Sequence, residues 1–362
     1  MGFTCGLVGL PNGGKSTIFN ALANGGARVE SYPFCTIEAN VGTVAVPDER
    51  LDRLHELFPE KKKVPTHLEF IDIAGLVEGA SEGEGMGNQF LAEIRAVDAI
   101  VHVVRCFEDS NVAHVTGTID PARDIEIVET ELLLKDHETL SRLAKRLSQE
   151  AKGKDRSAPA RLAAVEELLD RVAEGTPIRK AGFDPVIADL IREVSPLTAK
   201  PCLFVANVGD AGENGYSDSV LKIAEERGDG AVVIRGRLEA EIGEAAQTEE
   251  ERSSFLAEYG LTQTGLDALV HAGYRLLNLV TFFTFEGPEV RAWTVPAGTK
   301  APEAGGRIHS DFSERFVMAE VIDLDELCEA GSDKPLREAG RIKRVGHDYE
   351  VSDGDVIRFV CG

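Results

Sequence analysis

The sequence contains no apolar run long enough to cross a membrane and no cluster of cysteines. A membrane-spanning helix needs at least about 18 consecutive apolar residues, and no such stretch occurs in the 362 residues. The six cysteines lie far apart, without the paired spacing of a zinc site or a disulfide framework. The amino terminus lacks the basic flank of a secretory signal. We therefore expect a cytoplasmic protein that has no membrane partner.

Positive charge is also scarce. The chain has 39 Lys and Arg against 62 Asp and Glu, a formal net charge of −23. Such a charge repels a nucleic-acid backbone over long range, so contact with one requires a local basic patch. The candidates are residues 61–63, 152–156 and 341–344. Each is more typical of a solvated loop or helix face, and we expect no DNA partner.

The order of apolar patterns along the chain indicates an α/β fold with an insertion. The first third alternates β-rich runs with helical patterns, which is typical of a mostly parallel sheet covered on both faces. From Ile125 to Asp170 the apolar spacing is helical and is interrupted by "KGKDRSAP", which predicts a helical hairpin inserted at 125–198. Strands then resume until about residue 277. Residues 278–362 predict a small α+β module with a mixed sheet.

The most informative motif is "GLPNGGKS" at residues 9–16, which follows a predicted strand and precedes a predicted helix. It fits G-x-x-x-x-G-K-[ST], the phosphate loop of nucleotide-binding proteins. Glycines allow backbone N–H groups to face phosphates at a helix amino terminus. Lys15 would bring a cation to the β- and γ-phosphates and act in catalysis, and Ser16 would be a Mg²⁺ ligand.

Two further segments complete a nucleotide switch. The predicted strand "LEFIDIAG" ends in Asp72 and is followed by Gly75, a D-x-x-G arrangement. A carboxylate there can hold Mg²⁺ through water, and the Gly75 N–H can sense a γ-phosphate. Between the phosphate loop and this strand, Thr36 lies where a mobile loop would supply another Mg²⁺ ligand.

The residue that follows D-x-x-G is unsuited to hydrolysis. Ras-like GTPases place a water-orienting Gln there, whereas this chain has Leu76 at the start of a glycine-rich segment. Hydrolysis therefore requires another group, relies on metal ions alone, or is slow. His102 lies in an apolar strand pattern and is interpreted as a core residue. His114 lies beyond that strand, and both a catalytic role and a plain loop position remain open for it.

Taken together, "GLPNGGKST", "FIDIAGLVEGAS" and "DAIVHVVRCFED" resemble the YchF-type branch of the Obg-related P-loop proteins, the Obg-like ATPases. The likeness continues through "IHSDFSERFVMAEVI" and "DYEVSDGDVIRF" and covers nearly the whole chain. It implies a P-loop domain at 1–277, interrupted by a coiled-coil hairpin, and a TGS module of ubiquitin-like β-grasp fold at 278–362. It also implies a Mg²⁺-dependent ATPase that prefers ATP to GTP and associates with ribosomes, and we expect the large subunit to carry that contact.

By matching position, the resemblance assigns the nucleotide contacts to two segments. The phosphate-binding residues are Asn12, Gly13, Gly14, Lys15, Ser16 and Thr17. Adenine recognition is assigned to "NVGD", that is Asn207, Val208 and Asp210, with Val208 touching the base. Relatives with an apolar residue after D-x-x-G often use K⁺, for which Asn12 is the candidate ligand. His114 lies where the family is expected to supply the missing hydrolytic group.

The chain departs from the family pattern at two positions: Gly13 replaces the usual Val, and Asp210 replaces the usual Glu. In guanine readers the Asp of N-K-x-D accepts hydrogen bonds from N1–H and the 2-amino group. Adenine offers no such donors, so a carboxylate directed at it would be left unsatisfied. Conversely, Val208 replaces the Lys of that signature, and Arg235-Gly236-Arg237 replaces its Ser-Ala-Lys partner.

The sequence therefore predicts a slow, ATP-preferring hydrolase whose nucleotide state controls ribosome binding. A GTP-preferring switch of related architecture is the first alternative, because of Asp210. A nucleotide-sensing module without significant hydrolysis is the second, because of Leu76. Residues 278–362 contain 10 Lys and Arg against 16 Asp and Glu. Their charge gives no independent support for RNA binding, so the ribosome partner depends on the resemblance.

Overall fold

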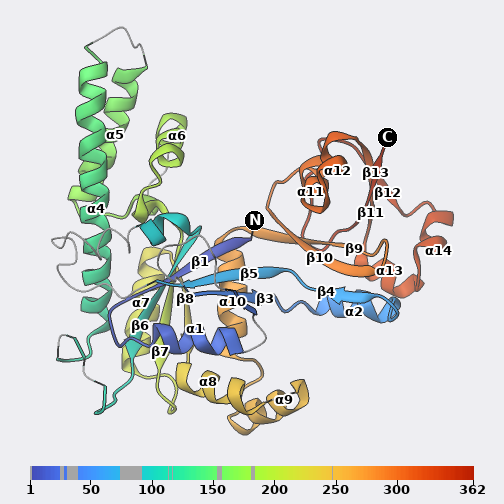
Figure 1. Cartoon of the computed structure of the whole chain (residues 1–362), viewed down its shortest axis with the longest axis horizontal. Coiled ribbons are helices and arrows are strands. Elements are labelled where there is room, and N and C mark those ends of the chain that lie inside the picture. The colour runs from blue at the N-terminus through green and yellow to red at the C-terminus, as the bar shows by residue number, and fades with distance from the viewer. Residues whose placement is uncertain are drawn as a thin grey trace. The chain divides into compact units, whose positions relative to one another are not determined.

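The computed structural model divides the chain into two compact units (Figure 1). The first comprises Met1–Val44 and Glu69–Leu276, and the second comprises Ala45–Leu68 and Leu277–Gly362. Each unit has its own sheet. The residues that the structure describes are 2–24, 28–30, 40–73, 92–112, 114–115, 117–152, 157–180, 184–246 and 248–362.

The first unit is built on a mostly parallel sheet with the described strand order β2-β3-β5-β1-β6-β7-β8. Its strands are β1 (Phe3–Val8), β2 (Arg28–Glu30), β3 (Asn40–Ala45), β5 (His67–Asp72), β6 (Ala99–Cys106), β7 (Cys202–Val208) and β8 (Gly230–Ile234). Strands β1, β6, β7 and β8 pair in parallel, whereas β2 and β3 are antiparallel. Every residue of β6 and β7 is buried, as expected for a sheet covered on both faces. The predicted α/β sheet is confirmed.

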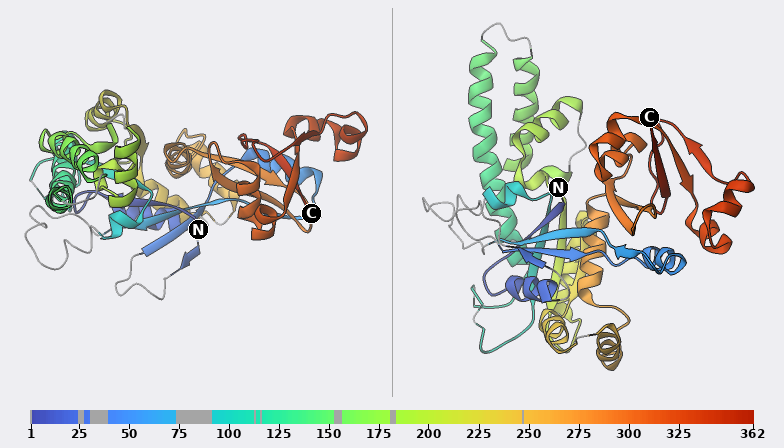
Figure 2. Two further views of the ribbon diagram at one scale, coloured as in Figure 1. Left: turned by 90° about the horizontal axis from the view of Figure 1, so that it is seen from above. Right: turned by 45° about the vertical axis from the view of Figure 1, so that its right-hand side comes forward.

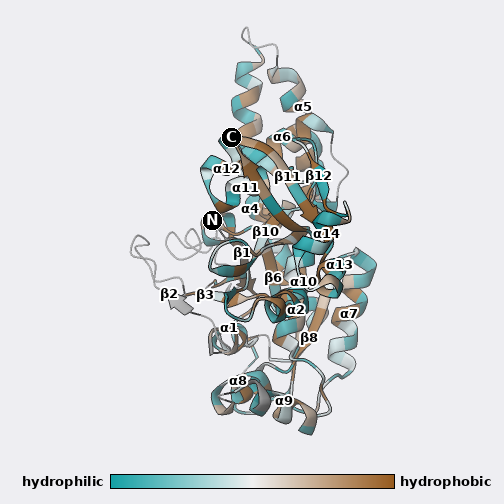
Figure 3. Ribbon diagram, turned by 90° about the vertical axis from the view of Figure 1, so that its right-hand side faces the viewer, coloured by the Kyte–Doolittle hydropathy of each residue, from teal (hydrophilic) through white to brown (hydrophobic). Residues whose placement is uncertain are grey.

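Helices cover both faces of this sheet. On one face α1 (Lys15–Asn24), α8 (Gly236–Ala245) and α10 (Gly265–Leu276) pack together, and α9 (Glu249–Glu258) packs against α8. On the other face α7 (Gly215–Arg227) and the first half of α4 (Pro121–Glu150) share a core with β6 and β7. Figure 3 shows both hydrophobic and hydrophilic residues along α7, whose buried residues Ser217, Val220 and Ala224 follow helical spacing. None of the described helices is both long and apolar enough to cross a lipid bilayer.

The predicted helical insertion forms an arm, the name used here for α4, α5 (Ala158–Ala173) and α6 (Pro185–Val194). Helix α4 begins at Pro121, four residues before the predicted start, because the Asp120 side chain caps it and Pro121 suits the first turn. Figures 1 and 2 show α4 and α5 side by side. Leucines of α4, including Leu140 and Leu147, form a shared core with Val165 and neighbouring residues of α5.

A buried ion-pair network fixes the base of the arm to the sheet. The Arg179 guanidinium, only 8% exposed, lies 2.7 Å from Glu129 of α4 and 3.1 Å from Asp229, which precedes β8. Lys180 pairs with Asp229 at 2.5 Å, and Arg227 of α7 pairs with Glu129. Buried charges persist only when they are paired in this way. The network therefore joins α4, α7 and the start of β8.

The second unit is an α+β module with a mixed sheet in the order β12-β11-β13-β9-β10-β4. Its strands are β4 (Lys62–Val64), β9 (Leu279–Thr284), β10 (Glu289–Pro296), β11 (Phe316–Ile322), β12 (Lys343–Val345) and β13 (Val356–Cys361). Its helices are α2 (Glu49–Leu57), α11 (Ala301–Ile308), α12 (Ser310–Glu314), α13 (Leu324–Ala330) and α14 (Asp333–Glu338). Two separate cores, one with α11 and α12 and one with α2, α13 and α14, cover the sheet. The mixed α+β module is confirmed, and its ubiquitin-like β-grasp assignment stays a prediction.

The predicted linear boundary at residue 277 separates only part of the two units. Residues 45–68, which the sequence predicts as part of the first domain, belong to the second unit. Leu51 and Leu54 of α2 are buried in its core, and β4 pairs in parallel with β10. Phe58 also stacks on Phe285, with ring centroids 5.1 Å apart. This segment lies with distant residues because its apolar side chains are buried against them.

Replacing Arg179 by Ala should destabilise the chain strongly. The change removes a positive charge that both the Glu129 and the Asp229 carboxylates contact in a buried site. Breaking a buried pair typically lowers the free energy of unfolding by about 3–5 kcal/mol. Arg192→Ala is the matched control, since Arg192 and its partner Asp189 are 76% and 73% exposed and such pairs contribute about 0–1 kcal/mol. Urea unfolding of both variants measures the difference, and equal losses would contradict the structural role of the network.

Candidate functional site

The phosphate-loop motif forms the turn between β1 and α1. Gly9 has φ 148°, Gly14 has φ 93° and Asn12 has φ 62°, all in the left-handed range. A Cβ atom at Gly9 would collide with the Val103 carbonyl oxygen, and one at Gly14 with the Asn207 amide. Glycine is therefore required at both positions by conformation and by space. The loop lies at the carboxyl end of β1, where ligands of open α/β sheets bind.

Lys15 begins α1 and turns back over this loop. Its Nζ donates hydrogen bonds to the carbonyl oxygens of Gly9, at 3.0 Å, and Leu10, at 3.1 Å. The side chain is 7% exposed. Burial lowers the pKa of Lys15, and the nearby Asp72 carboxylate opposes that shift. The loop carbonyls thus hold a cation in place, and an incoming phosphate would offer it a full negative charge.

The structure brings together two of the predicted Mg²⁺ ligands. Ser16 Oγ donates a hydrogen bond to Asp72 Oδ2 at 2.8 Å. A hydroxyl beside a carboxylate is a donor set that suits Mg²⁺, a hard cation that prefers oxygen. Thr17, the next residue of α1, is exposed. The other predicted contacts, Thr36 and Gly75, lie outside the described residues, as does Leu76.

Asn207, at the end of β7, connects the phosphate loop to the segment that follows β8. Its Nδ2 donates to the Gly13 carbonyl oxygen at 3.0 Å, and its Oδ1 accepts from the Gly236 N–H at 3.1 Å. The side chain is 4% exposed. A Cβ atom at Gly236 would lie 2.8 Å from that same Oδ1, so the contact requires glycine there. Asn207 therefore positions the loop that bears Gly13.

The remaining "NVGD" residues point in different directions. The Val208 side chain is 2% exposed and belongs to the core that β7 shares with α4 and α7. This placement leaves only the backbone of Val208 for contact with a base. Asp210 is exposed and contributes to the raised pKa of Arg237, whose main cause is a hydrogen bond to Glu241. The Asp210 carboxylate therefore lies in the electrostatic reach of the segment after β8.

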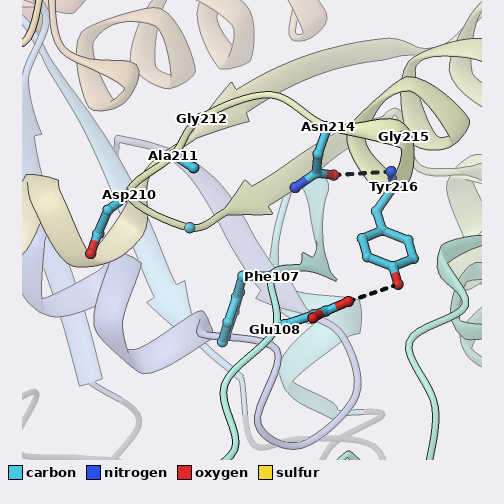
Figure 4. A pocket seen from close by; sticks show the side chains of 9 residues that line it. Phe107, Glu108, Asp210, Ala211, Gly212, Asn214, Gly215 and Tyr216 are labelled. Atoms are coloured by element: carbon cyan, nitrogen blue, oxygen red, sulfur yellow. Dashed lines mark hydrogen bonds between the residues drawn. The ribbon is translucent and has the colours of Figure 1, made fainter.

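A pocket of about 570 Å³ opens beyond Asn207, at the carboxyl ends of β6 and β7 (Figure 4). It is lined by two residues after β6, Phe107 and Glu108, and by two stretches after β7, Gly209–Gly212 and Asn214–Tyr216. A Cβ atom added to Gly209 would lie 3.5 Å from the Phe107 Cβ, in ordinary van der Waals contact, so Gly209 and Phe107 are neighbours in this wall. The pocket offers an aromatic surface beside an open stretch of backbone, which suits a planar ring.

Phe107 is a candidate binding residue that the sequence reasoning missed. The Arg105 guanidinium lies 4.5 Å from its ring centroid and donates to the carbonyl oxygens of Phe107 at 3.1 Å and Val112 at 3.0 Å. Arg105 is 4% exposed, so it holds the loop after β6 rigidly. The available signal was position, because Phe107 directly follows a buried parallel strand, at the edge where such sheets bind ligands.

The two histidines singled out from the sequence both have side chains with little exposure. His102 is 2% exposed beside Phe204, and burial lowers its pKa to about 3. It is a neutral core residue, as interpreted. The His114 Nε2 lies 2.9 Å from Asp124 Oδ2, and the two side chains are 8% and 5% exposed. Burial raises the pKa of Asp124, against the opposing effect of His114. A catalytic role for His114 stays a prediction.

Similarity to known proteins extends over the whole chain. The family model described as 50S ribosome-binding GTPase matches residues 4–144, and the YchF-GTPase C-terminal model, described as a protein of unknown function, matches residues 279–361. The chain is 46% identical over 362 residues to the ribosome-binding ATPase YchF of Escherichia coli O157:H7, covering 99% of each chain. It is 46% identical over 364 residues to the Bacillus subtilis (strain 168) protein of the same name, again covering 99% of each. The solved structure of the Schizosaccharomyces pombe YchF GTPase is 35% identical, with a TM-score of 0.87 over 99% of this chain and 97% of that one.

The site defines a P-loop nucleoside triphosphatase. Its phosphate loop holds a buried lysine, a serine–aspartate pair lies beside that lysine, and an asparagine fixes the loop to a mostly parallel sheet. Within that class, full-length identity of 46% is decisive. The chain belongs to the YchF family of Obg-related P-loop proteins. The resemblance inferred from its motifs is confirmed.

Replacing Asn207 by Ala should weaken binding of ATP and GTP by similar factors, because the change disturbs the phosphate loop rather than a base contact. It leaves the Gly13 carbonyl and the Gly236 N–H unpaired, at about 1–3 kcal/mol for each buried group. Since about 1.4 kcal/mol corresponds to a factor of ten, we expect at least a tenfold loss in a titration with fluorescent nucleotides. Asn111→Ala, at an exposed loop position, is the control. A loss confined to one nucleotide would show that Asn207 reads the base instead.

Proposed function

We propose that this chain is a slow, ATP-preferring P-loop ATPase of the cytoplasm whose nucleotide state controls its association with the ribosome. The observation that carries the proposal is the buried Lys15 over the phosphate loop, next to the Ser16–Asp72 pair. Full-length relatives named ribosome-binding ATPase support ATP as the nucleotide and the ribosome as the partner. The family model described as 50S ribosome-binding GTPase supports contact with the large subunit.

In the proposed reaction, water attacks the γ-phosphate in line with the leaving diphosphate. Lys15 exchanges its bonds to the Gly9 and Leu10 carbonyl oxygens for phosphate oxygens and neutralises their growing charge. Ser16, Asp72 through water, and Thr36 would hold Mg²⁺, whose chemistry is further neutralisation of phosphate charge. Asn12 is the proposed ligand for K⁺.

The preference for adenine is proposed from the groups that surround the base segment. Guanine presents O6 as an acceptor and N1–H with the 2-amino group as donors. The Gly236 N–H already donates to Asn207 Oδ1, so it is engaged before any base enters. Phe107 offers a stacking surface to either base. Among the described residues of the base segment, the exposed Asp210 carboxylate favours guanine, and it is the observation behind the alternative of a GTP-preferring switch.

Titration of the purified protein with labelled ATP and GTP should give tighter binding of ATP. Asp210→Glu should leave ATP affinity unchanged or improve it, because the carboxylate has no donor pair on adenine to accept from. Glu213→Asp, at an exposed position of the same loop, is the control for a change in carboxylate length. GTP binding at least tenfold tighter than ATP, or a selective loss of GTP affinity in Asp210→Glu, would establish the guanine alternative.

His114 is the proposed source of the hydrolytic group that Leu76 cannot provide. In the structure its imidazole is bonded to Asp124, in the first turn of α4. Movement of the ring toward a nucleotide would have to exchange this buried bond for one to the attacking water. Such an exchange would slow turnover, and it would take place at the base of the arm, where Asp124 lies.

His114→Ala should lower the single-turnover rate of ATP hydrolysis while ATP affinity stays within about twofold, because general acid–base groups typically contribute about 10²–10⁴-fold to rate. His137→Ala is the matched control, since His137 is an exposed histidine of α4. The assay is run with and without K⁺ and ribosomes. An unchanged rate in His114→Ala removes that residue from the mechanism. A wild-type rate equal to that of buffer in every condition would show a nucleotide-sensing module instead of an enzyme.

A further inference from the structure

The charge of the arm reverses along its length. Residues 121–140 of α4 carry two basic and six acidic side chains, whereas residues 141–152 carry four basic side chains and one acidic one. This reversal occurs in a chain with a net charge of −23. The far end of the arm is therefore a cationic site on an anionic protein. The name arm tip is used below for Arg142, Lys145, Arg146 and Lys152.

The basic side chains of the arm tip face solvent. All four residues are exposed, whereas Leu140, Leu143 and Leu147 are buried against α5. Helical spacing of three and four residues places Arg142 next to Lys145 and Arg146 on the side opposite those leucines. Arg142, Lys145 and Arg146 thus form a continuous surface on one face of the helix, and Lys152 follows in the turn beyond its end.

Local carboxylates neutralise only part of this surface. Glu150 lies 3.7 Å from Arg146, and Glu193 of α6 lies 3.5 Å from Arg146 and 2.5 Å from Arg161. Within the described part of the chain, Lys145 and Lys152 make no ion pair, and Arg142 bonds a backbone carbonyl, that of Glu138, at 3.3 Å. Three cations are therefore available to a partner.

Helix stability does not explain the three cations outside these ion pairs, Arg142, Lys145 and Lys152. Like charges three or four residues apart destabilise a helix by about 0.2–0.5 kcal/mol per pair. Cations stabilise the carboxyl end of a helix only within its last turn, and the last turn of α4 contains no basic residue. Recognition of an anionic partner accounts for their position better than helix stability does.

The length of α4 separates most of the arm tip from the acidic first half of that helix. With a rise of 1.5 Å per residue, Lys145 and Arg146 lie about 10 Å and about 12 Å beyond Glu138, the last acidic residue of that half. Both separations exceed the screening length of about 8 Å at physiological ionic strength, whereas Arg142, at about 6 Å, lies within it. A polyanion can therefore approach the arm tip without the full repulsion of the acidic first half of α4.

We propose that the arm tip docks on the phosphate backbone of RNA, which on the ribosome is structured ribosomal RNA. The inference deepens the proposed ribosome association by naming its surface and its chemistry. Exposed Arg and Lys without aromatic neighbours fit phosphates rather than bases, because phosphate contacts position a protein without reading sequence. The contact is consequently independent of RNA sequence and sensitive to salt.

The test compares Arg142→Gln/Lys145→Gln with the control Arg192→Gln/Lys222→Gln in the full chain. Arg192 and Lys222 are helix residues with side chains 76% and 75% exposed, so each double variant removes one Arg and one Lys from a solvated helix. Binding is measured by cosedimentation with ribosomes, and by fluorescence anisotropy with a protein-free RNA duplex at several salt concentrations. ATP affinity and thermal unfolding are measured on all proteins.

We expect the arm-tip variant to lose at least tenfold in ribosome and duplex affinity. Its slope of log K against log salt should fall by about 1.4–1.8, since two phosphate contacts are lost and each contributes about 0.7–0.9. The control should stay within twofold, and ATP affinity and unfolding should be unchanged. Wild-type protein that binds ribosomes with the same affinity as the arm-tip variant would overturn the arm-tip proposal alone. Loss of ribosome binding with unchanged duplex binding would overturn RNA as the partner. Wild-type protein that does not bind ribosomes would overturn the proposed association itself.

Discussion

The arrangement of the nucleotide site depends on the hydrogen bonds of one buried amide. Asn207 joins the Gly13 carbonyl of the phosphate loop to the Gly236 N–H at the start of α8. Three segments far apart in sequence thereby keep a fixed relation at the carboxyl edge of the sheet. The contact leaves no room for a side chain at Gly14 or Gly236. The backbone conformation at Gly14, the close packing and the hydrogen bonds of the Asn207 amide therefore all require these same glycines. When several requirements agree in this way, the sequence specifies a single structure.

Neighbouring residues of β7 connect this site to the arm. Successive side chains of a strand point to opposite faces of a sheet. Asn207 accordingly faces the phosphate loop, and Val208 lies in the core shared with α4 and α7. The ion-pair network around Arg179 fixes the same helices to the start of β8. The phosphate loop is thus connected to the base of the arm by direct contacts, first through β7 and then through the ion-pair network around Arg179.

Much of this fold and site was predictable because the relevant signals are local. The phosphate loop, the strand that ends in Asp72 and the hairpin all have short patterns with a direct physical cause. The placement of residues 45–68, the pairing of His114 with Asp124 and the inward direction of Val208 were not predictable. Each depends on partners distant in sequence, or on which face of a strand is covered. Apolar periodicity marks a residue as buried but does not identify what covers it.

The charge pattern of the chain becomes informative only when it is placed on the fold. Summed over the sequence, 62 acidic residues outweigh 39 basic ones and argue against any nucleic-acid partner. The fold separates the two signs, because α4 carries its acidic half against the sheet and its basic half at the free end of the arm. At distances beyond the screening length, a partner responds to the nearest charges rather than to the net charge. An acidic protein can therefore meet a polyanion, provided that a long helix holds its few solvated cations away from the rest.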